Sequence, residues 1–109
     1  MTHAVMAVEG GKMLIFEAVE TCDSEWVEAL LDGGANPNAT DRYGNTLLHL
    51  ALCSNEKPES ILAVVKILVK AGADTGARNR FGHTPLYLGG ERVPKEVADF
   101  LRKHGGRWY

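Results

Sequence analysis

The sequence repeats itself, and this constrains the fold more than any other feature. Asp41–His49 reads Asp-Arg-Tyr-Gly-Asn-Thr-Leu-Leu-His, and further along the chain Asn79–Tyr87 reads Asn-Arg-Phe-Gly-His-Thr-Pro-Leu-Tyr. Leu30–Ala39 returns as Leu68–Ala77 with the same offset. Self-similarity at a fixed spacing of roughly 20–50 residues is the signature of a repeat architecture, in which units too small to fold alone stack and share one core.

A third copy extends the pattern to both ends of the chain. The segment Leu101–Gly106 is a third copy of the end of the unit, the copy before it starting at Leu68. Residues 11–18 fall where the first unit should begin. The middle unit is longer than the spacing from Leu68 to Leu101, and we place its excess at Asn55–Ser60, between its two helices. We predict a single domain over 1–109. Its three units cover 10–40, 41–78 and 79–106, with an N-terminal extension at 1–9 and a C-terminal tail at 107–109.

A period of about 33 residues with a Thr-Pro-Leu-His-like opening resembles the ankyrin repeat. The resemblance rests on Thr46–Ala51, on Thr84–Gly89 and on the Gly-Ala-Asn/Asp turns after Gly34 and Gly72. It implies an all-α repeat solenoid, an ankyrin-type stack of helix-turn-helix units joined by β-turn or hairpin loops. It also implies that His49 is a buried, hydrogen-bonded histidine that ties neighbouring turns together.

Local chemistry predicts where the second helix of each unit begins and ends. We expect starts at Asp23 or Ser24, near Pro58 and at Pro94, which suit an N-cap or a first helical turn. Apolar residues then recur at helical spacing, and each helix stops at a glycine able to adopt a left-handed C-cap, at Gly34, Gly72 and Gly105. Gly89-Gly90 lowers the helix propensity of the first helix of the last unit, and we expect this final unit to be the frayed end of the stack.

Composition and the absence of known motifs reduce the classes of function that the chain can have. A net charge of −2 does not favour nucleic acid as a partner, and there is no apolar run long enough to span a membrane. Cys22 and Cys53, the only cysteines, provide no disulfide framework, which favours the cytoplasm. No nucleophile elbow, phosphate loop or metal-ligand spacing occurs. We therefore expect no enzyme, no cofactor and no metal site, and a protein that binds another protein.

The resemblance also indicates a surface for such binding. In ankyrin-like proteins the turn tips and the exposed side of the first helices form a concave face that holds partners. Mapped onto this sequence, with Glu20 and Thr21 along the same face, the predicted partner-binding residues are Thr40, Arg42, Tyr43, Asn45, Cys53, Ser54, Arg78, Arg80, Phe81, His83, Glu91 and Arg92. The four arginines in this set suggest an acidic partner segment.

Three points stay open at the level of sequence. Tyr43 and Phe81, each beside an arginine, are either binding hot spots or flat covers that stabilise the stack. Trp108 and Tyr109 either cap the last helix pair or anchor a partner. Residues 1–33 carry a net charge of −6 and residues 79–109 a net charge of +3, which allows weak self-association through the ends as an alternative function.

Overall fold

The structure is a computed structural model that describes residues 14–108. The predicted extension 1–9, the start of the first unit before residue 14, and Tyr109 lie outside the described residues. Residues 14–20 are helical and are followed by α2 (Ser24–Asp32), α3 (Leu47–Leu52), α4 (Pro58–Lys70), α5 (Pro85–Gly89), a 3-10 turn η1 (Gly90–Arg92) and α6 (Lys95–Lys103).

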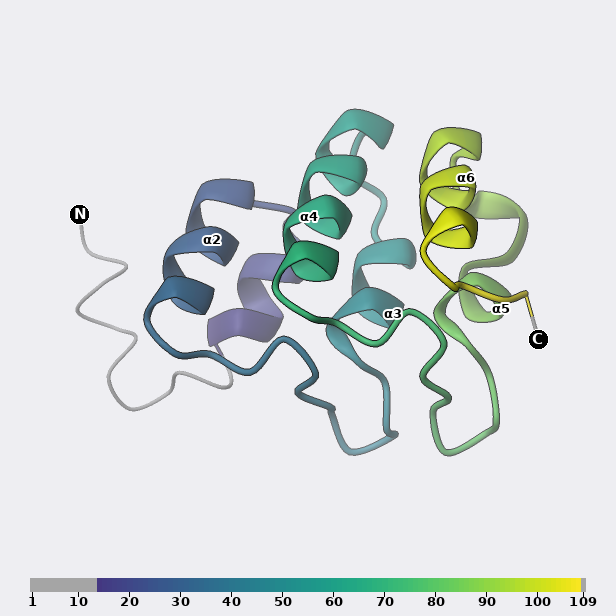
Figure 1. Cartoon of the computed structure of the whole chain (residues 1–109), viewed down its shortest axis with the longest axis horizontal. Coiled ribbons are helices and arrows are strands. Elements are labelled where there is room, and N and C mark those ends of the chain that lie inside the picture. The colour runs from purple at the N-terminus through teal and green to yellow at the C-terminus, as the bar shows by residue number, and fades with distance from the viewer. Residues whose placement is uncertain (1–13, 109) are drawn as a thin grey trace.

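The helices form two parallel rows (Figure 1). Helices α2, α4 and α6 make one row, in which α4 contacts both α2 and α6, and α3 packs on α5 in the other row. Two long loops leave the helices on one side of the stack. Apart from an isolated β-bridge between Thr40 and Thr46, the described residues contain no β-structure. The predicted all-α stack of helix-turn-helix units is confirmed.

The core runs between the two rows and through all three units. The residues at helical spacing in the second helices face it and are buried: Val27, Leu30, Val64, Leu68, Val97 and Leu101. From the other row, Ile15, Leu48 and Leu86 are fully buried against them. Because each unit buries its apolar side against the next, the core is shared along the stack, as the repeat predicts.

The helix ends also follow the sequence. The Asp23 side chain accepts a hydrogen bond from the Trp26 amide at 3.2 Å and caps α2, and Pro58 occupies the first turn of α4. The glycines that follow α2, α4 and α6 have φ of 107°, 102° and 95°, the left-handed conformation expected of a C-cap: Gly34, Gly72 and Gly105.

One expectation, the place of the insertion, needs correction, and Gly89 has a packing role that the sequence does not show. Only part of the insertion Asn55–Ser60 separates the helices, because Pro58–Ser60 form the first turn of α4, which is 13 residues long against 9 for α2 and α6. Gly89 is buried, which gives it this packing role. A Cβ built on it would lie 2.5 Å from Val93 Cγ2 and 3.2 Å from the Leu52 carbonyl oxygen, so this glycine permits close packing of α5 on α3. The helix does end there, and Gly90 then turns the chain at a φ of 60°.

Candidate functional site

The two loops that leave the stack end in β-turns of the same construction. In the first, the Asp41 carboxylate accepts hydrogen bonds from the amides of Tyr43 and Asn45, at 2.8 and 2.9 Å. In the second, the Asn79 side-chain oxygen accepts from the amides of Phe81 and His83, at 2.9 and 3.0 Å. A carboxylate or amide at the first position of a turn thus holds the backbone, and the side chains that follow need not take part.

Neighbouring turns are fixed to each other through backbone and amide groups. The Arg80 amide donates to the Tyr43 carbonyl at 2.9 Å, and the Asn79 side-chain amide donates to Asn45 Oδ1 at 2.8 Å. Gly44, at a φ of 78°, allows this approach, since a Cβ there would meet the Arg80 nitrogen at 3.0 Å. The two tips therefore form one continuous, hydrogen-bonded edge of the molecule.

The buried side chain of His49 links the two turns from inside the molecule. The Thr46 amide donates to His49 Nδ1 at 2.9 Å, and His49 Nε2 lies 2.8 Å from the His83 carbonyl oxygen. An amide only donates and a carbonyl only accepts, so the neutral ring carries its proton on Nε2. The side chain is fully buried, and this burial lowers the pKa of His49 below its ordinary 6.5. The predicted buried, hydrogen-bonded imidazole is confirmed.

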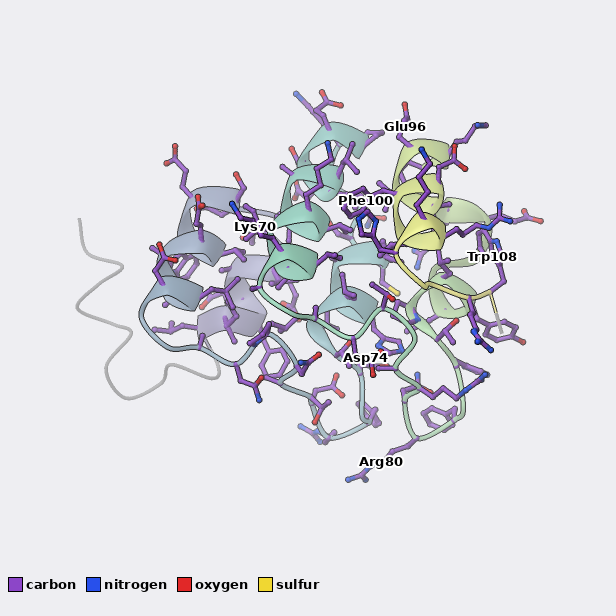
Figure 2. The ribbon with its side chains drawn as sticks, in the orientation of Figure 1. Lys70, Asp74, Arg80, Glu96, Phe100 and Trp108 are labelled. Carbon is purple, nitrogen blue, oxygen red and sulfur yellow. The ribbon has the colours of Figure 1, made fainter. Side chains whose placement is uncertain are left out.

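The aromatic side chains of the tips lie in solvent. Tyr43 keeps 50% of its surface exposed and Phe81 68%, so both rings are accessible to a partner. The Arg42 guanidinium carbon is 5.8 Å from the centre of the Tyr43 ring, and Arg80 extends from the end of its turn away from the helices (Figure 2). The Asp41 and Asn79 side chains thus hold the turns, whereas the Tyr43 and Phe81 side chains face solvent and join the turns through their backbone alone.

A third exposed aromatic residue, Tyr87, joins the second tip. Its ring centre is 4.4 Å from that of His83, which is 6.3 Å from that of Phe81. Tyr87 is 50% exposed, although it stands where the middle unit has the buried His49. Sequence reasoning missed it as a surface residue; the signal available was the replacement of His by Tyr in the repeated motif. We call the combined surface the tip surface: Thr40, Arg42, Tyr43, Arg78, Arg80, Phe81, His83 and Tyr87.

The structure does not bring all the predicted residues into one cluster. Asn45 is half-buried and serves the contact between the turns. A second group follows the opposite, C-terminal ends of α3 and α5: Cys53, Ser54, Glu91 and Arg92. Within it, the Ser54 hydroxyl accepts from the Cys22 thiol at 3.6 Å and from the Glu56 amide at 3.0 Å. The predicted Glu20 and Thr21 similarly lie at the end of the first helical segment, Glu20 as its last residue.

Neither thiol is activated. Burial raises the pKa of Cys22, and burial also raises the pKa of Cys53, against the opposing effect of the Arg92 guanidinium beside it. A thiol with a raised pKa is a poor nucleophile and a poor metal ligand at neutral pH. Within residues 14–108, no group of three or more His, Cys, Asp or Glu side chains could hold a metal ion.

The tail packs back onto the last unit. The Thr84 hydroxyl donates to the Arg107 carbonyl, and Trp108 is partly buried against the core. Figure 2 shows Trp108 beside the end of the stack formed by α5 and α6. Of the two open alternatives for this residue, the structure shows the cap.

The comparison with protein families agrees with this geometry. A family model described as ankyrin repeats, three copies, matches residues 15–107. The chain therefore belongs to the ankyrin repeat family, whose members are generally protein–protein interaction modules. No curated protein matches the sequence. In the described part of the chain, no helix is both long and apolar enough to cross a membrane.

Proposed function

We propose that this protein is a small adaptor or inhibitor that binds one partner protein through the tip surface and the exposed side of the first helices. The domain division 1–109 and its three units belong to this proposal, with Cys53, Ser54, Glu91 and Arg92 at the far edge of the contact. We assign the protein no catalytic role, because the His49 imidazole is buried and hydrogen-bonded within the fold, and burial raises the pKa of the Cys22 and Cys53 thiols, which makes them poor nucleophiles.

One observation carries the proposal. The turn tips are held by Asp41, Asn79 and backbone amides, yet they present Tyr43 and Phe81 to solvent. Exposing large aromatic rings to water costs free energy, and folding here does not require that exposure. Aromatic and arginine side chains on a rigid edge are the composition of binding hot spots.

We further propose that the protein works in the cytoplasm, where its cysteines stay reduced. Cys22 and Cys53 are both free thiols, and Cys22 is buried. Disulfides are common in secreted proteins of this size, which need them to support a small core. Cell fractionation with detection of the untagged chain tests this, and its recovery outside the cytoplasm would contradict the location.

Affinity purification from the native host, followed by mass spectrometry, tests the binding role. The full chain serves as bait beside a triple variant, Tyr43→Ala, Arg80→Ala and Phe81→Ala, in which the turn-forming Asp41 and Asn79 are intact. We expect the wild type to recover a partner that the variant loses. Recovery of the same partners by both baits would exclude the tip surface as the binding site.

A second candidate is self-association through the ends. Its support is electrostatic: residues 14–33 contain six carboxylates and no Lys or Arg, whereas Arg102 and Lys103 lie in the last unit and Arg107 in the tail. The acidic set is Glu17, Glu20, Asp23, Glu25, Glu28 and Asp32. Light scattering across protein concentration and salt tests this candidate, and a monomer under every condition would remove it.

A further inference from the structure

The second tip differs from the first because an aromatic cluster continues from it into α5. His49 in the middle unit points inward, since its Nε2 bonds to the carbonyl of the following turn. In the described part of the chain no turn follows the last unit, and Tyr87 at the same position packs against His83 and is half exposed. Phe81, His83 and Tyr87 therefore form one accessible row of rings.

Arginines flank these rings. Arg78 Nη1 donates to the Gly82 carbonyl at 2.9 Å, which fixes this guanidinium between the positions of Phe81 and His83 along the turn. Arg80 precedes Phe81 and extends into solvent (Figure 2). Among residues 14–108 the salt bridge found is Lys95–Asp99 at 3.0 Å, so neither Arg78 nor Arg80 is paired with a carboxylate of this part of the chain. The cluster thus combines apolar area with two positive charges that folding leaves unneutralised.

We infer that this cluster binds an acidic protein segment in which an apolar or aromatic side chain lies among carboxylates. The inference rests on the proposed function and specifies its partner. Guanidinium groups pair with carboxylates in a bidentate geometry, and an apolar side chain covers the exposed rings. A neutral or basic segment would leave Arg78 and Arg80 partly desolvated without a counter-charge.

A nucleic acid would also meet positive charge and exposed rings, but the rest of the surface does not suit it. Residues 14–33 of the same chain carry only negative charge among their ionisable groups of Asp, Glu, Lys and Arg. A long polyanion would be repelled by this end, whereas a short acidic segment contacts the tips alone. An oligonucleotide is therefore a probe that the test includes and that we expect to bind weakly.

The test is a selection from a displayed library of random peptides on the immobilised full chain. We expect the enriched peptides to carry a net negative charge and at least one apolar or aromatic residue. Their binding should weaken as salt is raised, because charge pairs on an exposed edge are screened. Synthetic copies in which each Glu and Asp is replaced by Gln and Asn should bind at least about tenfold more weakly.

Variants of the chain locate the contact. Arg80→Glu and Phe81→Ala should each weaken an enriched peptide by about tenfold or more. Lys57→Glu is the matched control: it makes the same charge reversal in an exposed side chain beyond the opposite end of α3, and should change binding by less than about twofold. Circular dichroism of each variant checks that it is folded.

The outcomes separate this inference from the proposed function. Enriched peptides that are neutral or basic, yet are lost in Phe81→Ala, would overturn the acidic partner and leave the tip surface as a binding site. Acidic peptides whose affinity is the same in Arg80→Glu and Phe81→Ala would overturn the cluster and the tip surface together. A selection without any binder, or an oligouridylate that binds more tightly than the enriched peptides, would also overturn the inference.

Discussion

The middle and the last unit use the same position of the repeat for opposite purposes. His49 in the middle unit is fully buried and joins Thr46 to the carbonyl of the next turn. Tyr87, the equivalent residue of the last unit, is half exposed, and the hydroxyl of its N-cap Thr84 donates instead to the carbonyl of Arg107 in the tail. Among the described residues no further turn covers Tyr87, so a position that is buried in the middle unit is part of the surface in the last.

This difference teaches how a short stack acquires a binding surface. Inside the stack each unit is covered on both sides, so its polar motif residues are committed to neighbours. The last described unit is covered by α3 and α4 on one side, and the tail residue Trp108 also packs on it. The Tyr87 ring of this unit is half exposed. The two positions should therefore differ in their contribution to stability as clearly as they differ in exposure.

The largest effect should come from His49→Ala. It removes the partner of a buried amide, Thr46, and the bond to the neighbouring turn, so we expect unfolding free energy to fall by about 2–4 kcal/mol. Tyr87→Ala should cost less than about 1 kcal/mol, because the ring is half exposed and makes no buried hydrogen bond. Urea unfolding of both variants measures this, and equal losses would break the comparison.

The next largest effect should come from Gly89→Ala. The added Cβ would lie 2.5 Å from Val93 Cγ2 and 3.2 Å from Leu52 Cβ, so we expect a loss of about 1–3 kcal/mol despite the higher helix propensity of alanine. In a Val93→Ala background the loss caused by Gly89→Ala should fall by at least about half, as a double-mutant cycle measures. A stabilising Gly89→Ala would show that the helix propensity of alanine outweighs this close packing.

A smaller effect should appear with pH. Burial lowers the pKa of His49, so the folded chain takes up this proton less readily than the unfolded chain. The contribution of His49 is therefore complete above the unfolded pKa of 6.5 and falls as the pH drops through 6.5 toward the lower folded value. Each unit of that lowering amounts to about 1.4 kcal/mol.

Chemical denaturation at about pH 7.5 and about pH 5.5 measures this effect. A His49→Gln variant, with His83 and His104 unchanged, should lose the part of the pH dependence of the unfolding free energy that His49 contributes. If the variant and the wild type show the same dependence on pH, the neutral buried imidazole does not set it.

The smallest effect on stability should come from Phe81→Ala. With 68% of its surface exposed, the ring contributes little to the core, and we expect a change within about 0.5 kcal/mol. The thermal unfolding midpoint of this variant measures it. A loss as large as that of Gly89→Ala would assign Phe81 to the fold and count against its role in binding.

Most of the fold could be predicted because repetition makes the sequence redundant. The matching ends of the unit locate the second helices, and Gly34, Gly72 and Gly105 adopt the left-handed caps that their positions predict. What could not be predicted depends on contacts between units. Gly89 reads as a helix breaker in its own segment, yet its lack of a side chain is required by Leu52 and Val93. The division of the insertion between loop and helix likewise depends on how far α4 extends over its neighbours.

The candidate site could be predicted less completely. The tips themselves, with Tyr43 and Phe81, follow from the register of the repeat, but which residues of a tip hold the turn and which face solvent does not. In the structure Asn45 is hydrogen-bonded to Asn79 of the neighbouring turn, whereas Tyr87 is half exposed because no turn of the described residues covers it. The function of these side chains stays a prediction.

The most direct test of the central claim measures stability and binding on one variant. The triple variant Tyr43→Ala, Arg80→Ala, Phe81→Ala removes three of the solvent-facing side chains of the tip surface and keeps the turn bonds of Asp41 and Asn79. If the tips are built as described, the triple variant unfolds within about 1 kcal/mol of the wild type and no longer binds the partner captured by the wild type. A variant that is equally stable and binds the partner with unchanged affinity would contradict the account.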